Sequence, residues 1–184
     1  MITRSESGRN YLATPDIITC NSVLNACAFE KAKTEEERGV IVKIVVDTLE
    51  TFQKATPRYG YPDHVTYAQV LYAISNQMEP GEEQYALAEA TFWQCCQAGQ
   101  VNAKVVNALE HALSWPRFAA LMGSALKSRD GEKASFNLSL FPRTWTRHAL
   151  KRNKVGTNSR ASRKRDRGYK VTNQGLKKLS DRSQ

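Results

Sequence analysis

Histidine and cysteine are the residues of this 184-residue chain that could carry metal or nucleophilic chemistry. The candidates are His64, His111, His148, Cys20, Cys27, Cys95 and Cys96. The histidines lie far apart in sequence, and no two cysteines have the two-residue separation typical of a pair of metal ligands. The sequence also lacks a glycine-rich phosphate loop and a Gly-x-Ser-x-Gly nucleophile motif. We therefore predict no catalytic residue, no metal and no cofactor, and we expect the cysteines to pack in a core within a reducing compartment.

Amide and carboxylate side chains that recur in a repeated phrase offer a different chemistry, the recognition of hydrogen-bonding groups. The phrase TPDIITCNSVL begins at Thr14, and YPDHVTYAQVL begins at Tyr61, 47 residues later in register. A weaker third copy, VNAKVVNALEHAL, begins at Val101 and has Asn102 where the other copies have aspartate. Periods of this length are typical of solenoids built from helical hairpins.

The elements that must position these side chains are pairs of helices. The first helix opens after Pro15-Asp16 and carries an apolar stripe, Cys20, Val23, Leu24, Cys27 and Ala28. Its partner spans 34–54, where Thr34 and Glu37 have capping-box spacing, and its inward stripe includes Ile41, Ile44, Val45, Leu49 and Phe52. The same plan predicts helices over 64–78 and 82–96, then over 103–113 and from Ser114 to about Leu126. No strand is predicted.

The predicted fold is therefore all-α, an α-α superhelix in which helix-turn-helix hairpins stack as in tetratricopeptide-like solenoids. We expect a disordered N-terminus over 1–7, a hairpin array over 8–126, a linker with a tryptophan-containing motif over 127–150, and a disordered basic tail over 151–184. The three units of the array are 17–63, 64–102 and 103–126.

The helix opening Pro-Asp-x-x-Thr-Tyr/Cys-Asn-x-x-Leu resembles that of the pentatricopeptide repeat family of RNA-binding proteins. The resemblance covers about residues 8–126 and is strongest in PDIITCNSVL. The first two units are longer than the family consensus, as in algal and particularly diatom members, and LFPRTWTRHALKRN resembles the tryptophan motif that closes many of them. The segment before the first motif looks like the end of a preceding repeat, so we expect the chain to be the C-terminal part of a longer array.

The resemblance implies which residues would read RNA bases. The fifth residue of a repeat and the last residue of the same repeat would address one base, with an apolar residue stacking beside it. Asn21 with Asp63 resembles a uracil-preferring pair, and family pairs of threonine with aspartate resemble guanine readers. The implied base-reading residues are Asn21, Asp63, Ala68, Asn102 and Asn107, and the implied stacking or backbone-contacting residues are Ile18, Val65 and Lys104. Ala68 departs from the pattern because it lacks a hydrogen-bonding group.

Structural roles explain the same residues without RNA. Asp16 and Asp63 suit the starts of helices, where a carboxylate accepts hydrogen bonds from free backbone N–H groups. Asn21 lies off the apolar stripe and is explained by exposure to solvent, while Ile18 and Val65 are explained as packing residues. Spacing alone does not choose between these interpretations.

Charge is divided unevenly along the chain. Residues 1–142 contain 13 Lys/Arg and 16 Asp/Glu, a net charge of −3, whereas 143–184 contain 14 and 2, a net charge of +12. Nonspecific contacts with RNA phosphates are expected from Arg160, Arg163, Lys164, Arg165, Arg167 and Lys170. A solvated tail and a nuclear import signal are the alternatives. Tyr169 and Trp145 could stack on bases.

These features together predict a noncatalytic protein that binds single-stranded, uracil-containing RNA in organellar RNA processing, stability or translation. The family resemblance places it in a mitochondrion or plastid, and a protein partner would supply any RNA chemistry. No apolar run is long enough to cross a membrane. The alternative is a tetratricopeptide-like protein-interaction scaffold with a basic targeting tail, which would have no reason to keep the Asn21 and Asp63 pair. An enzyme with an unrecognised site is the third class.

Overall fold

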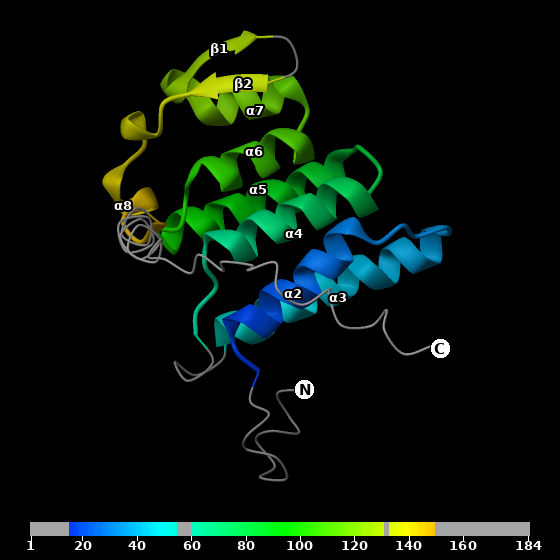
Figure 1. Ribbon diagram of the computed structural model, residues 1–184. Coiled ribbons are helices and arrows are strands. Elements are labelled where there is room, and N and C mark those ends of the chain that lie inside the picture. Colours follow the sequence, from blue (N-terminus) through cyan, green and yellow to red (C-terminus); the bar gives the residue numbers. More distant parts are fainter. Residues whose placement is uncertain (1–14, 55–59, 131–132, 150–184) are drawn as a thin grey trace, which may run out of the picture. The chain divides into compact units, whose positions relative to one another are not determined.

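Helices dominate the part of the chain that the computed structural model describes, which is residues 15–54, 60–130 and 133–149 (Figure 1). Six helices follow one another in pairs: α2 (Ile17–Phe29) with α3 (Glu35–Lys54), α4 (His64–Gln77) with α5 (Glu82–Gln97), and α6 (Ala103–Ala112) with α7 (Trp115–Met122). The predictions for 1–7 and for the tail over 151–184 lie outside the described residues.

The repeated phrase marks helix starts, as predicted. The Asp16 side chain accepts a hydrogen bond from the Thr19 backbone N–H at 2.9 Å and caps α2. Asp63 caps α4 in the same way, and Asn102 caps α6 by accepting from the Val105 N–H at 3.1 Å. Each side chain satisfies backbone donors that a helix leaves unpaired at its start.

The boundaries of the second helices also follow the sequence. Thr34 and Glu37 exchange backbone and side-chain hydrogen bonds at the start of α3, at 3.2 and 3.4 Å, which confirms the capping box. At the end of α5, Gly99 has a φ of +67°. A Cβ at Gly99 would meet the Thr144 carbonyl oxygen at 2.9 Å, so glycine serves both the turn and the close approach of a later segment.

Helix α4 is the centre of the packing. It contacts α2 and α6 along its sides, and it also contacts α3 and α5 (Figure 1). The most deeply buried side chains come from all three pairs and include Leu24, Val45, Leu71, Phe92, Leu109 and Phe118. Burying these side chains provides the main stabilisation, at about 1.5 to 3 kcal/mol for each.

Two residues of the predicted apolar stripes lie at the surface. Cys20, Leu24 and Ala28 of the first helix are buried, but Val23 is 39% exposed. In α3, Val45, Leu49 and Phe52 are buried, whereas Ile44 is 41% exposed. Periodicity identifies the apolar side of a helix, but a neighbouring element must be present to cover all of it.

The prediction that no strand occurs is wrong. The strands β1 (Leu126–Asp130) and β2 (Lys133–Phe136) pair antiparallel, with Leu126 opposite Phe136. Helix α7 ends at Met122 instead of Leu126, because Gly123 takes a φ of +49° and a short 3-10 helix, η3 (Gly123–Ala125), leads into β1. This hairpin is short and mostly polar, so it lacks the apolar alternation by which a strand is recognised in a sequence.

The region predicted as a linker contains further short elements that join the core. After β2 come the 3-10 helix η4 (Leu138–Leu140) and α8 (Arg143–Thr146), and α8 contacts α5. The backbone of Val101 donates to the Trp145 carbonyl at 2.8 Å, and that of His148 donates to the Gly99 carbonyl at 2.9 Å. Backbone hydrogen bonds therefore hold 145–148 against the turn between α5 and α6.

Candidate nucleic-acid interface

Asn21 and Asp63, 42 residues apart in sequence, are brought together at the junction of α2 and α4. The Asn21 side-chain Nδ2 donates to the Asp63 Oδ1 across 3.3 Å. Asn21 lies in the second turn of α2 and is half-buried, while Asp63 precedes α4 and is 6% exposed. The pairing implied by the family resemblance is thus a contact between neighbouring hairpins.

Thr66 completes a network that fixes the orientation of the Asn21 amide. The Thr66 Oγ1 lies 2.7 Å from the Asn21 Oδ1, to which it donates, and it accepts from the Asp63 backbone N–H at 3.1 Å. The Asp63 Oδ1 accepts from the backbone N–H groups of Val65 and Thr66 at 3.0 and 3.1 Å. Asn21 is therefore held by hydrogen bonds and is not simply a solvent-exposed side chain. The helix-start interpretation of Asp63 is confirmed, and the same carboxylate also reaches Asn21.

The second implied pair, Ala68 with Asn102, offers less to a ligand. Ala68 is buried, and Asn102 is nearly buried with its side-chain oxygen bonded to the Val105 N–H. In the third unit, Asn107 and Lys104 are both exposed on α6. The structure thus assembles a hydrogen-bonded pair in the first unit and leaves single polar side chains in the third.

The two implied stacking residues differ in exposure. Ile18 is 70% exposed in the first turn of α2, so it is not a core residue in this structure. Val65 is half-buried in the first turn of α4. Both belong to helices whose starts carry the Asn21–Asp63–Thr66 network.

A row of rings crosses the first helix of each pair, that is α2, α4 and α6, and the sequence analysis did not predict it. The ring centroids of Phe29 and Tyr72 lie 6.2 Å apart, and those of Tyr72 and His111 lie 5.9 Å apart. Phe29 is 60% exposed, Tyr72 is half-buried and His111 is exposed. Tyr72 and His111 are separated by 39 residues, the same interval as Asp63 and Asn102, and this interval is the signal that could have revealed their contact. Phe29 does not follow the repeat interval.

Polar contacts hold this ring row, Phe29, Tyr72 and His111, in register. The Asn76 Nδ2 donates to the Ala28 carbonyl at 2.8 Å, and the Ser75 Oγ donates to the His111 carbonyl at 2.9 Å. These bonds tie α4 to the last turns of α2 and α6. The rings therefore sit on a fixed frame, as the Asn21 amide does at the other end of the helices.

The first helix of each pair carries fewer charged residues than the second helices α3 and α5. Helices α2 and α4 contain no Asp, Glu, Lys or Arg, and α6 contains only Lys104 and Glu110. In contrast, α3 and α5 begin with clusters of glutamates. A polyanion would be repelled by the starts of α3 and α5 and would meet a nearly uncharged surface on α2, α4 and α6.

Trp145, which could have stacked on a base, packs inside an aromatic cluster. Its ring lies 6.1 Å from that of Phe92, 5.5 Å from that of Trp93 and 5.7 Å from that of Phe141. Trp145 thus attaches α8 to α5, which is a structural role. Tyr169 and the six basic residues predicted to contact phosphates lie outside the described residues.

The cysteines occupy the core, as expected. Cys20, Cys95 and Cys96 are buried and Cys27 is half-buried, and none of them is in a disulfide. Burial raises the pKa of Cys20 and of Cys96 to about 12, and it also raises the pKa of Cys95 and Cys27. At neutral pH these thiols stay protonated, and a protonated thiol is a poor nucleophile. Within the described ranges, no three His, Cys, Asp or Glu side chains gather in a group that could hold a metal ion.

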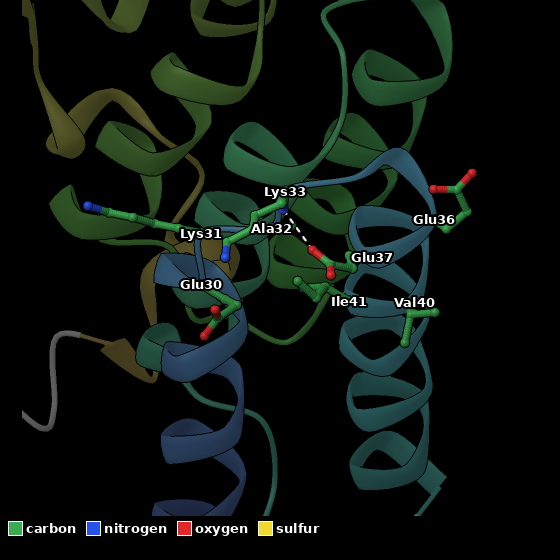
Figure 2. Close-up of a pocket in the computed structure, with 8 residues that line it drawn as sticks. All are labelled: Glu30, Lys31, Ala32, Lys33, Glu36, Glu37, Val40 and Ile41. Carbon is green, nitrogen blue, oxygen red and sulfur yellow. Dashed lines mark hydrogen bonds between the residues drawn. The ribbon is translucent and has the colours of Figure 1, made fainter.

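Two hollows of about 510 Å³ mark the surface of the described residues. Figure 2 shows the first, between residues 30–33 and the start of α3; it is lined by Glu30, Lys31, Ala32, Lys33, Glu36, Glu37, Val40 and Ile41. Its mixed charges include three glutamates, which makes it a poor site for phosphate. The second is lined by Gln53, Tyr61, Pro62, Tyr67, Ala98, Gln100 and His148.

No family model, curated protein or solved structure matches this chain. Among the described helices, none combines the length and the apolar character needed to cross a membrane.

Proposed function

We propose that this chain binds single-stranded RNA without catalysing a reaction, and that it does so through the first helices of stacked helical hairpins that form an α-α superhelix. The observation that carries the proposal is the Asn21–Asp63–Thr66 network, which joins α2 to the start of α4, two helices that contain no charged residue between their caps. Organellar RNA processing, stability or translation, in a mitochondrion or plastid, is the setting proposed from the family resemblance.

Asn21 would read one base with the hydrogen-bonding capacity that the network leaves. A side-chain amide has two N–H donors and two acceptor lone pairs. One donor faces Asp63 and one lone pair faces Thr66, so one donor and one lone pair remain. Uracil presents a carbonyl acceptor beside an imino N–H donor, which complement the remaining donor and lone pair of the Asn21 amide. Because the amide is already oriented, little side-chain entropy is lost when the base binds.

The ring row would provide stacking that does not depend on base identity. Aromatic side chains stack on any base, and each such contact contributes about 1 to 3 kcal/mol. Phe29, Tyr72 and His111 lie on the same three helices as the implied reading residues. The face would thus combine one selective position with a general stacking surface, and its affinity would be only weakly sequence-dependent.

The substitution Asn21→Thr tests the selective position. We expect preference to move from uracil toward guanine by about fivefold or more, since one hydrogen bond is worth about 1 kcal/mol. The measurement is the affinity of the full-length protein for matched oligonucleotides that differ at one base. Asn25→Thr is the control, because Asn25 lies one turn further along α2 and bonds Gln69 instead. Equal preference in wild type and Asn21→Thr would favour the protein-interaction scaffold.

The substitution Phe29→Leu tests the stacking surface. Leucine preserves most of the apolar area but removes the ring, so we expect RNA binding to weaken by about fivefold or more for every sequence. Phe29→Trp should retain binding, and its added fluorescence should be quenched when RNA binds. Binding unaffected by Phe29→Leu would remove the ring row from the interface while leaving the role of Asn21 open to its own test.

A further inference from the structure

The first hairpin has an uncovered apolar surface. In the described part of the chain, eight large apolar side chains are exposed, and five of them belong to α2 and α3. They are Ile18, Val23, Phe29, Val40 and Ile44. These two helices make their main contacts with each other and with α4, so no other described helix packs extensively against the hairpin (Figure 1).

In the second hairpin, the positions that correspond to this surface are covered. Its second helix begins 47 residues after that of the first hairpin, at Glu82 against Glu35, which is the interval of the repeated phrase. By this register Val23 corresponds to Val70, and Ile44 corresponds to Thr91. Val70 and Thr91 are 1% and 3% exposed, whereas Val23 and Ile44 are 39% and 41% exposed. Positions that are buried in the second hairpin are therefore open in the first.

The uncovered surface, which we call the N-terminal face, consists of Val23, Val40 and Ile44 with Lys43 and Asp47 beside them. Val40 is 59% exposed, and both charged side chains are exposed. Neither Lys43 nor Asp47 forms an ion pair with another described residue.

We propose that the N-terminal face binds a second copy of this chain, so that two first hairpins pack head to head about a two-fold axis. A two-fold axis through Ile44 would run the two α3 helices antiparallel and would place Ile44 against its own counterpart. Lys43 of one copy would then lie about 3 Å along the helix axis from the partner's Asp47, because each residue of a helix rises 1.5 Å. The same surface thus offers self-complementary apolar groups and self-complementary charges.

Analytical ultracentrifugation of the full chain over about 1 to 100 µM tests this proposal. We expect a concentration-dependent dimer in the wild type. Ile44→Glu should weaken dimerisation by at least about tenfold, because dimerisation would bury an unpaired charge. Leu140→Glu is the matched control, since Leu140 is 56% exposed but lies in η4. It should leave the dimer unchanged.

A charge exchange adds geometric detail to the test. Lys43→Glu should weaken the dimer, and the double substitution Lys43→Glu with Asp47→Lys should restore it, because each lysine again faces a carboxylate. Circular dichroism melting of each variant separates loss of dimer from loss of fold. A wild type that stays monomeric at 100 µM would overturn the proposal. A monomer destabilised by Ile44→Glu would show that Ile44 already packs within the monomer, and it would overturn the proposal equally.

Discussion

Removing residues 153–184 is expected to abolish most of the salt-dependent affinity for RNA. This segment contains 10 Lys/Arg and 2 Asp/Glu. If the six basic residues between Arg160 and Lys170 each neutralise a phosphate, the slope of log affinity against log salt loses about 4, at about 0.7 for each contact with a single strand. Over a fourfold change in salt, that slope corresponds to a change of about 250-fold in affinity.

The chain should end at Arg152 in this experiment and not earlier. Ending it at Pro142 would remove Trp145, whose carbonyl accepts from Val101 and whose ring packs on Phe92 and Trp93. A protein that ends at Pro142 would lose packing as well as charge, so the effect of charge on RNA binding could not be measured separately. Ala149 is fully buried, which also argues for a boundary beyond it.

The measurement is binding of a uracil-rich single strand at about 50 and 200 mM salt, with the full chain and the protein ending at Arg152. Replacing the six basic residues by glutamine in the full chain is the control, because it keeps the length and removes the charge. Both variants should show the same shallow salt dependence. A salt slope unchanged by either variant would mean that the tail makes no contact with phosphate, and it would leave the first helices to account for all binding.

Periodicity predicted the paired helices well because each one carries a strong local signal. Asp16, Asp63 and Asn102 cap their helices, and Thr34 with Glu37 forms the capping box. These interactions join residues a few positions apart, so their spacing is visible in one sequence. The β-hairpin at 126–136 was missed because its pairing gives no apolar alternation.

The candidate site was harder to predict because it depends on contacts between hairpins. The family resemblance named Asn21 and Asp63 together as base readers, and the structure shows a hydrogen bond between them without testing that role. Thr66, which bonds Asn21, was treated only as part of the repeated phrase. Phe29 and Tyr72 are 43 residues apart and do not correspond in the 47-residue register of their helices, so no pattern in the sequence predicts that contact. Val23 and Ile44 fit their stripes yet are exposed, since a stripe does not specify what covers it.

The same network that positions Asn21 makes Asp63 important for folding. Asp63→Ala is expected to lower the free energy of unfolding by about 2 to 4 kcal/mol. Loss of the N-cap accounts for about 1 kcal/mol of this. That N-cap term covers the N–H groups of Val65 and Thr66, and the rest arises because the Asn21 Nδ2 also loses its acceptor near a buried junction. Urea unfolding of the full chain followed by circular dichroism measures the effect.

Asp16→Ala is the matched control, since Asp16 occupies the same place in the phrase but is exposed and caps only its own helix. It should cost clearly less than Asp63→Ala, and an equal cost would contradict a role for Asp63 in joining the hairpins. Asp63→Asn separates folding from recognition, because asparagine is also a good N-cap and can accept from Asn21. If Asp63→Asn keeps stability but shifts base preference, the carboxylate takes part in recognition. If it changes neither, Asp63 acts by holding the Asn21 amide in place, and base selection depends on Asn21 alone.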